Sequence, residues 1–526
     1  MRRVNSSPMK KILFILLAFI PPQSNAQLAF DRYFVFDTYV WGTQIVEIPG
    51  QGYFVAGIDD SLIIDNSGIP QANYRQGYVL KLNYQGDSTK IFRIGNGDTT
   101  YTHNFGNNSD DLFNSIVVTD DENLFLAGET QSYDADNFYD YDFWLIKMNT
   151  NLDTLWSSRF SIPDSQLVLD YAYCKKTHKD GIVFPGHQDE FSNGIIHHQL
   201  TAFDSSGQVK FHKAILPFLI GEFLGVVETE DNGFIAVGNS FNDWFNSDCS
   251  PLIVKTDSTG NVEWYQILPY SGDLHFASDV IKTINGRYIY AWANVVDNPG
   301  ALHKVWISHT TKIDILGNVI WTHDYEYTRD EAQRLKELPN GNFMICGWTS
   351  DTIDFRRKAL LQVCDSSGNT LWTRKISGDP ISYIDCENGT NTSDGGFILC
   401  GQTLCCNYNA VLGYNTGSLW IAKTDSFGLI TSVVNLPKPD FNNTLLGNPF
   451  PNPASQSSTI STMISPEISK AELLVFDLNG KQLQEIEIET GYNETSINLS
   501  AYSNGEYVIA LSIDGFNGGT KKVVKK

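Results

Sequence analysis

The feature that most constrains the fold of this chain is an internal repeat with a period near fifty residues. Each copy begins with an apolar strand that ends, in six of seven copies, in glycine, as in EDNGFIAVG (230–238). The intervals between these marker positions are 71, 58, 52, 54, 55 and 54 residues. About four short strands fit each period, which predicts one propeller blade per repeat and a ring of seven blades. The marker positions are Gly57, Gly128, Gly186, Gly238, Trp292, Gly347 and Gly401.

Two other repetitive β-folds fit this pattern less well. The coils of a β-solenoid are shorter than fifty residues, and β-sandwiches do not repeat seven times along a chain. The strand–turn–strand copies resemble the bulb-like and kelch-like propeller repeats of secreted bacterial proteins. That resemblance implies an all-β fold with a seven-bladed β-propeller.

The second half of each copy also has a fixed pattern, as in LIVKTDSTGNVEW (252–264). Trp156, Trp264, Trp321 and Trp372 occupy one position of it, which predicts packing within the fold. The last copy has Ser432 at that position, and the β-rich segment 29–36 precedes the first full copy. We therefore expect residues 29–36 to pair beside residues 429–434 and to close the ring.

The connections within each repeat divide into two kinds. The tight turns are rich in Asp, Asn and Gly, which supply the backbone angles that hairpins need. The other connections differ from copy to copy. Because connections of an antiparallel meander alternate between its two ends, the variable ones should share one face, where a rigid scaffold presents them. Examples are residues 58–76, 129–142, 239–250, 348–358 and 402–418.

The last eighty residues have a separate character. They contain a Pro-Asn-Pro turn, a strand and turn reading FDLNGK, a later strand reading GEYVIALSI and the basic end KKVVKK. These features resemble, in order, the type A C-terminal sorting domain of the type IX secretion system of Bacteroidetes. The resemblance implies a small C-terminal β-sandwich, handling by that secretion machinery, and attachment to the outer cell surface or release. The matching residues are Pro451, Asn452, Pro453, Asp477, Gly480, Lys481, Gly505 and Tyr507.

The N-terminus independently predicts export. Four basic residues precede the short apolar run 12–20, and the small residues 24–26 follow it, as in a cleavable signal peptide. That run is too short for a resident membrane helix, and no later stretch is apolar enough to span a membrane. The predicted domains are a signal peptide (1–26), the propeller (27–437), a proline-containing linker (438–446) and the sorting domain (447–526).

The charge of the chain limits its partners. The chain has 37 basic and 60 acidic residues, and removal of residues 1–26 takes away four basic residues and no acidic ones. The mature charge is therefore 33 − 60 = −27. So negative a protein should repel nucleic acid and anionic lipid. An extracellular glycan or protein is the expected partner.

The sharpest candidate site lies in the segment SYDADNFYDYDFW (132–144). Closely spaced carboxylates suit Ca²⁺, the only cofactor that the sequence suggests, although the glycine and the terminal glutamate of an EF-hand loop are missing. The alternative is a solvated acidic loop. The candidate metal ligands are Asp134, Asp136, Asp140 and Asp142.

Aromatic residues on the variable connections are candidates for stacking on sugar rings. The alternative for each is packing at the edge of a blade. The candidates are Tyr133, Tyr139, Tyr141, Trp244, Trp348, Tyr408 and Tyr414.

No catalytic motif is present in the sequence. It has no GxSxG, HExxH, Walker A, CxxC or GxGxxG pattern, and its one histidine pair, His197 and His198, lies on a predicted strand with the two side chains on opposite sides. Two function classes remain. The favoured one is a non-enzymatic binding protein, and the alternative is a glycan-cleaving hydrolase or lyase, which would need converging carboxylates at the funnel.

Overall fold

The computed structural model describes one chain built from strands. It covers residues 29–34, 39–64, 70–94, 111–130, 141–162, 165–168, 172–190, 195–241, 249–268, 275–296, 305–325, 330–350, 357–376, 383–409, 414–430, 445–464, 471–477, 482–513 and 516–526. Throughout these ranges the regular secondary structure is β-strand, without a helix. The all-β expectation is confirmed.

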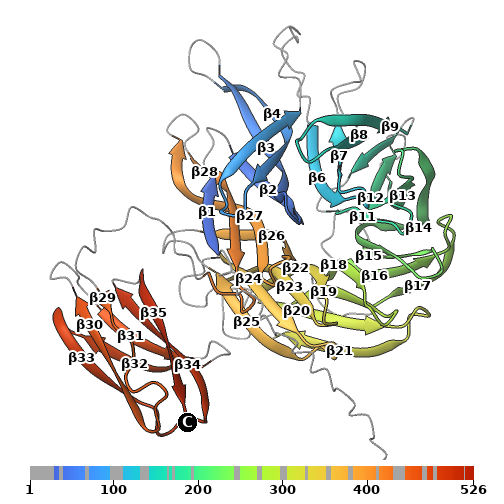
Figure 1. The fold of residues 1–526 in the computed structure, drawn as a ribbon. Coiled ribbons are helices and arrows are strands. Elements are labelled where there is room, and N and C mark those ends of the chain that lie inside the picture. The colour runs from blue at the N-terminus through green and yellow to red at the C-terminus, as the bar shows by residue number, and fades with distance from the viewer. Residues whose placement is uncertain are drawn as a thin grey trace, which may run out of the picture.

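The N-terminal part of the described chain forms six antiparallel sheets around a ring (Figure 1). Five have four strands, and the sixth has eight, because β14 runs from one blade into the next, so that the sheets correspond to seven blades. Blade 1 contains β2 (Tyr39–Ile48), β3 (Gly52–Ile64), β4 (Pro70–Leu82) and β5 (Ser88–Ile94); blade 2 contains β6 (Asp111–Val118), β7 (Leu124–Thr130), β8 (Asp142–Met148) and β9 (Thr154–Phe160). Blade 3 contains β10 (Ser165–Val168), β11 (Lys175–Lys176), β12 (Ile182–Glu190), β13 (Ile196–Phe203) and the first half of β14 (Val209–Glu228).

The remaining blades follow in chain order. Blade 4 contains the second half of β14, β15 (Phe234–Phe241), β16 (Cys249–Thr256) and β17 (Val262–Ile267); blade 5 contains β18 (His275–Lys282), β19 (Tyr288–Val296), β20 (Val305–Ile313) and β21 (Val319–Tyr325). Blade 6 contains β22 (Asp330–Glu337), β23 (Phe343–Ser350), β24 (Arg357–Cys364) and β25 (Thr370–Ile376); blade 7 contains β26 (Ile384–Asn391), β27 (Phe397–Asn409), β28 (Tyr414–Thr424) and β1 (Phe30–Phe34).

The N-terminal strand closes the ring, as predicted, but with a different partner. β1 pairs antiparallel with β28, from Phe30 opposite Lys423 to Phe34 opposite Leu419. In Figure 1 the first strand, in blue, therefore lies beside the orange strands of the last blade. The expected pairing with residues 429–434 is wrong, because β1 itself serves as the outer strand of blade 7. Residues 429 and 430 are not in a strand, and 431–434 lie outside the described residues.

One turn recurs in all seven blades of the described chain. Directly after the third strand, an Asn or Asp side chain accepts backbone N–H groups from the residues two and four positions later, at 2.8–3.0 Å. Such side-chain bonds stabilise a turn without using strand hydrogen bonds. The first residues of these turns are Asn83, Asn149, Asp204, Asp257, Asp314, Asp365 and Asp425.

The fourth residue of each turn receives an aromatic ring from the preceding blade. It has φ between 60° and 91°, and six of the seven are glycine. A Cβ added to Gly207 would lie 2.5 Å from the ring of Trp156, and one added to Gly317 would lie 3.1 Å from the ring of Trp264. The aromatic position that the sequence assigned to packing therefore joins adjacent blades. Phe30 of β1 covers Gly86 in the same way, so it fills the position for which the sequence offered only Ser432.

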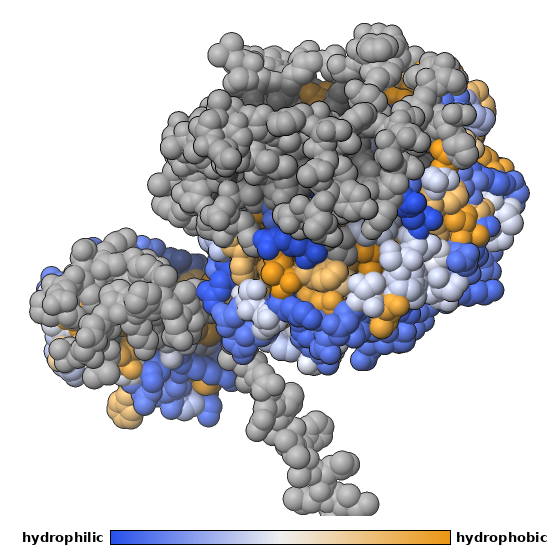
Figure 2. All heavy atoms as spheres, turned by 90° about the horizontal axis from the view of Figure 1, so that it is seen from above, coloured by the Kyte–Doolittle hydropathy of each residue, from blue (hydrophilic) through white to orange (hydrophobic). Residues whose placement is uncertain are grey.

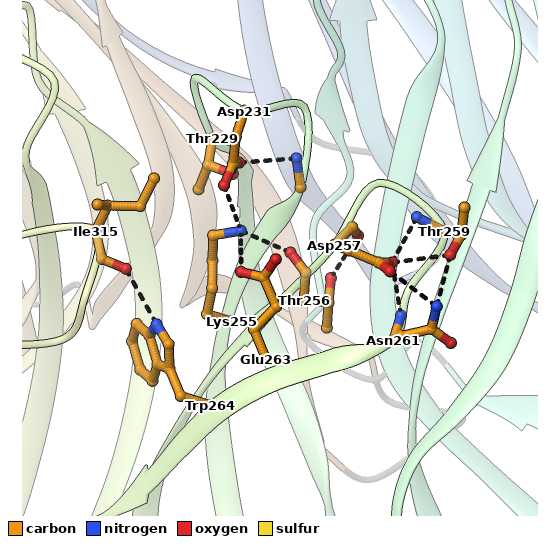
Figure 3. A network of polar contacts seen from close by, with 11 residues as sticks. Thr229, Asp231, Lys255, Thr256, Asp257, Thr259, Asn261, Glu263, Trp264 and Ile315 are labelled. Atoms are coloured by element: carbon orange, nitrogen blue, oxygen red, sulfur yellow. Dashed lines mark hydrogen bonds and ion pairs between the residues drawn. The ribbon is translucent and has the colours of Figure 1, made fainter.

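Buried lysines support the same turns. The Lys255 side chain is 1% exposed, and its Nζ lies 3.0 Å from Asp231 Oδ2, 2.9 Å from Glu263 Oε2 and 2.8 Å from the Thr256 carbonyl oxygen (Figure 3). In the same view Trp264 Nε1 donates to the Ile315 carbonyl oxygen of the next blade at 3.0 Å. The buried ammonium group is thus compensated by two carboxylates and a carbonyl oxygen, and it links the two tight turns of blade 4.

Two of the expected variable loops are largely strand. β3 and β4 continue as a hairpin through most of residues 58–76, and β27 and β28 do so through most of 402–418. Runs of β-favouring residues extend these ladders further than the repeat alone indicated. The variable connections still share one face, opposite the tight turns, because four antiparallel strands place them there.

The C-terminal residues form two sheets that enclose a core of their own. One sheet contains β29 (Leu445–Leu446), β30 (Ser457–Ile464) and β33 (Gly491–Asn498). The other contains β31 (Ala471–Phe476), β32 (Gln482–Ile488), β34 (Gly505–Ile513) and β35 (Phe516–Lys525). Their inward side chains, among them Ile460, Leu473 and Ile509, are fully buried. Leu445 and Leu446, in the segment expected as a linker, already pair with β30.

Candidate functional site

The propeller has two unlike faces, which we call the turn face and the loop face. The turn face carries the short turns described above, and the loop face carries the variable connections. The structure describes four of the predicted metal and ligand residues at or next to the loop-face ends of strands, and these lie in three blades: Tyr141 and Asp142 in blade 2, Trp348 in blade 6 and Tyr408 in blade 7. Tyr414 begins β28, opposite Asn409 of β27. Tyr133, Tyr139, Trp244, Asp134, Asp136 and Asp140 lie outside the described residues.

The one described member of the acidic cluster is engaged with an arginine. Asp142 is 2% exposed, and its Oδ2 lies 3.6 Å from an Arg159 guanidinium nitrogen. Within the described ranges, no three His, Cys, Asp or Glu side chains are grouped as a metal site would require. The calcium hypothesis therefore remains a prediction that depends mainly on Asp134, Asp136 and Asp140.

Two more buried aspartates on the loop face have arginine partners. Asp59 accepts a hydrogen bond from Arg93 Nε at 3.0 Å, and both Asp385 carboxylate oxygens lie 3.0 Å from a single nitrogen of Arg357. The sequence analysis did not identify these pairs, because the partners are 34 and 28 residues apart and follow no motif. Such pairs fix the strand ends from which the variable connections begin.

Trp348 is covered by this arrangement. Its side chain is 9% exposed, and the Arg357 guanidinium lies 4.1 Å from the centre of its ring. A cation over an aromatic face is a stabilising contact. Of the two interpretations that the sequence left open for Trp348, this geometry favours packing over an open platform for a sugar.

Buried histidines occupy other strand ends on the loop face. Burial lowers the pKa of His198 to about 4, and its Nε2 lies 2.7 Å from the Asn239 carbonyl oxygen. His309 stacks on Trp292 with ring centres 3.9 Å apart, and its nitrogens lie within 2.7 Å of Asp324 and Asn294 oxygens. Burial lowers the pKa of His309, while Asp324 acts in the opposite direction. Both rings therefore hold strand ends as neutral imidazoles near pH 7.

Side chains from non-adjacent blades meet at the axis of the ring. The Arg334 guanidinium of blade 6 lies 3.6 Å from the centre of the Tyr173 ring of blade 3. Lys175 of blade 3 lies 3.1 Å from Asp279 of blade 5. Asp279 also accepts the N–H groups of Val280 at 2.8 Å and Leu335 at 3.0 Å. Both of its oxygens are therefore engaged in holding blades 3, 5 and 6 together.

In the C-terminal domain the Pro-Asn-Pro turn is attached to the last strand. Asn452 donates from Nδ2 to the Lys522 carbonyl oxygen at 2.7 Å and accepts the Val524 N–H at 2.9 Å. The peptide bonds before Pro451 and Pro453 are cis. Tyr507, at the start of β34, donates to the Ser503 carbonyl oxygen at 2.7 Å.

Of the other four residues of the predicted sorting signal, two are described and two are not. Asp477 directly follows β31, and Gly505 is the first residue of β34. Gly480 and Lys481 lie outside the described residues. Of the described residues, Asn452 is therefore bonded to β35, and Gly505 and Tyr507 belong to β34.

Residues 448–526 match the family model of the secretion system C-terminal sorting domain. The C-terminal domain is a type IX sorting domain. The sorting domain directs the protein to the cell surface or out of the cell, so the predicted localisation is confirmed. In the described part of the chain no helix is long and apolar enough to cross a membrane.

Comparisons of the whole chain with solved structures find low similarity. A protein of unknown function from Dyadobacter fermentans is 9% identical, with a TM-score of 0.41 over 75% of this chain and 97% of its own. The β-propeller domain of the Trilobed protease from Pyrococcus furiosus is 9% identical, with a TM-score of 0.40 over 78% and 99%. An α-L-arabinofuranosidase from Fusarium graminearum is 13% identical, with a TM-score of 0.39 over 58% and 91%.

None of these likenesses carries an argument about activity, because every TM-score is below 0.5. The propeller assignment rests on the sheets themselves. No curated protein matches the chain.

Proposed function

We propose that the protein is an extracellular binding protein, whose propeller presents a glycan or protein ligand site on the loop face. The observation that carries the proposal is the difference between the two faces. The turn face is built from one repeated turn with short, locked connections, whereas the connections that vary in length and sequence all emerge on the other face. Variable connections on a rigid scaffold are the usual place for binding residues.

The loop-face contacts support this proposal. Three Asp–Arg pairs, in blades 1, 2 and between blades 6 and 7, fix strand ends that flank variable connections. Tyr141 is half-buried beside one of these pairs. The surface shown in Figure 2 mixes hydrophilic and hydrophobic residues, as expected for a protein that is exported and exposed to solvent.

The alternative is a glycan-cleaving hydrolase or lyase with its site in the funnel. Hydrolysis of a glycosidic bond commonly requires two carboxyl groups on opposite sides of the bond. Among the described residues, Asp279 is an acid whose contacts place it at the axis, and it is 2% exposed, ion-paired and doubly hydrogen-bonded. A carboxylate held in this way supports the fold and is poorly available to a substrate, so binding is the better-supported function.

The finer domain assignment forms part of the proposal. Residues 1–26 are a cleaved signal peptide, 27–437 a ring of bulb-like or kelch-like blades, and 447–526 the type A domain of a Bacteroidetes protein. The linker expected at 438–446 is shortened to 438–444, because Leu445 and Leu446 pair with β30. The export pathway is tested by deleting residues 447–526 in the native host. We expect the truncated protein to remain folded in the periplasm, and delivery of it to the surface at the wild-type level would contradict the pathway.

A further inference from the structure

Two buried cysteines lie together at the contact between blades 6 and 7. Cys346 is on β23 of blade 6 and Cys386 is on β26 of blade 7, and both are 0% exposed. They belong to one buried apolar cluster that these two blades form. The Cys346 Sγ also lies close to the β26 backbone, because a Cβ added to Gly389 would be 3.4 Å from it. Both cysteines are thiols in this structure.

The register of blade 7 shows that Cys386 points toward blade 6. Residues directly opposite each other on antiparallel strands have their side chains on the same face. Cys386 is opposite Gly401, and Gly389 is opposite Leu399, with a β-bulge between the two pairs. Positions 399 and 401 share a face, so Cys386 and Gly389 share it as well. Leu399 packs in the same cluster as Cys346, so this face is the one that meets blade 6.

The two thiols are close enough to interact. Burial, and after it the hydrogen bond with Cys346, raises the pKa of the Cys386 thiol. Independently of that contact, Cα atoms of β23 and β26 come within 8 Å of each other. A disulfide usually joins Cα atoms about 4.4–6.8 Å apart. A bond between these two sulfurs therefore requires only a small approach of the two strands.

A third buried cysteine, Cys400, points the other way. It is opposite Asn388, one position along β27 from Leu399, so its side chain is on the face of blade 7 away from blade 6. There it packs in a cluster with residues of blade 1, and its Sγ lies 3.9 Å from the Gly42 carbonyl oxygen. Cys400 is therefore a matched control, because it is equally buried in the same blade but lies outside the pair.

The export route exposes the unfolded chain to an oxidising compartment. A protein with a type IX sorting domain passes through the periplasm, where disulfides form and persist. Both sulfurs are enclosed once the propeller has folded, so a bond formed during folding would be protected from external reductants.

We propose that Cys346 and Cys386 form a disulfide bond in the exported protein, which joins blade 6 covalently to blade 7. Two S–H bonds break and one S–S bond forms. The two electrons and two protons pass by thiol–disulfide exchange to a protein disulfide of the periplasm, which is reduced to two thiols. Blade 7 contains strands from both ends of the propeller chain, so the bond secures the blade that closes the ring. This inference does not depend on the binding proposal.

The test is peptide mapping, without reduction, of the whole chain purified from its native host. The protein is unfolded in denaturant with iodoacetamide, which alkylates free thiols, and is then digested. We expect one cross-linked pair of peptides containing Cys346 and Cys386, lighter by two hydrogen atoms than the reduced peptides, and alkylated Cys400. Alkylation of both Cys346 and Cys386 would overturn the proposal, and so would a cross-link of either one to another cysteine.

Cys346→Ala and Cys400→Ala show what the bond does for stability, since each removes one fully buried thiol. The proteins are reduced in denaturant and refolded with reductant present. The Tm of wild type and of Cys400→Ala should then fall by the same amount, because the unfolded chain regains freedom that the bond removes. Cys346→Ala should not respond to reduction, and a fall equal to that of wild type would contradict the proposal. If Cys346→Ala does not fold, the peptide map of wild type still decides.

Discussion

Single aromatic side chains determine how one blade meets the next. Trp156, Trp264 and their equivalents each lie over a turn residue that has no side chain, so that the ring contacts the backbone directly. The left-handed φ of that residue also favours glycine. Blade 2 differs: Leu152 takes the turn position with φ 60° and lies in one cluster with Phe92.

Gly207→Ala should destabilise the propeller more than Gly50→Ala does. Both glycines have φ near 80°, where an L-residue costs about 1–2 kcal/mol. Only at Gly207 would the new Cβ also meet a ring, that of Trp156, whereas nothing lies within 4 Å at Gly50. Overpacking should add about 1–3 kcal/mol. Thermal unfolding of the two variants measures the difference, and equal Tm values would show that the aromatic contact has no energetic weight.

The aspartates in the turns after the third strands should make the thermal stability of the propeller decrease at acid pH. Hydrogen bonds from Asn318, then from backbone amides, hold the pKa of Asp314 below its usual value, and Asn369 does the same for the pKa of Asp365. A carboxyl group with a lowered folded-state pKa stabilises the fold above its unfolded pKa of about 3.9. That stabilisation is lost as the pH falls through the folded-state pKa.

The double variant Asp314→Asn/Asp365→Asn tests this pH dependence. Asparagine is already the first residue of two of the seven turns. Asn83 and Asn149 accept the same two backbone N–H groups at the first position of their turns, with an amide in place of the carboxyl group. In those two turns the carboxyl group is at the fifth position, on Asp87 and Asp153. We expect the Tm of wild type to fall more steeply below about pH 4 than that of the double variant. Parallel Tm curves for the two proteins would mean that these carboxylates do not contribute.

The closing strand β1 depends on one buried ring. Phe30 is 3% exposed and contacts Gly86 and Tyr53 of blade 1, while Asp31 accepts the Trp420 indole N–H at 2.8 Å. Without β1, the edge of β28 would be open to other chains. The strand therefore joins the first and last blades and protects the sheet edge.

Phe30→Ala should destabilise the propeller by about 3–5 kcal/mol, because it removes a buried aromatic side chain at the closure. Arg32→Ala is the control on the same strand. It removes an ion pair with Asp87 worth at most about 1 kcal/mol, a hydrogen bond to the Gln85 carbonyl oxygen and the guanidinium contact with the Phe30 ring, but it leaves that ring in place. Thermal unfolding and limited proteolysis measure both. If the two variants behave alike, β1 does not hold the ring closed.

For the molecule as a whole, the sequence predicted the propeller and the export signal. The propeller repeat recurs along the chain, and the residues of the C-terminal motif lie within the last eighty residues, so both signals are visible in the sequence. The partner strand of β1 was predicted wrongly. Phe30 and Trp420 are 390 residues apart, and the pairing was inferred from Ser432, which replaces the tryptophan in the last repeat. The axial cluster was missed for the same reason: Lys175, Asp279 and Arg334 come from three repeats and share no motif. The ion pair of Asp142 shows that local acidity alone does not reveal which partner a carboxylate has.

The most direct test of the binding proposal is an array of glycans and extracellular proteins, probed with the whole chain and two variants. One variant replaces residues 131–140 of the loop face with a Gly/Ser segment of equal length. The other changes only the turn face, by Ser366→Ala and Thr259→Ala. We predict a ligand that binds wild type and the turn-face variant and is lost from the loop-face variant. Binding that survives in the loop-face variant and is lost from the turn-face variant would contradict the account.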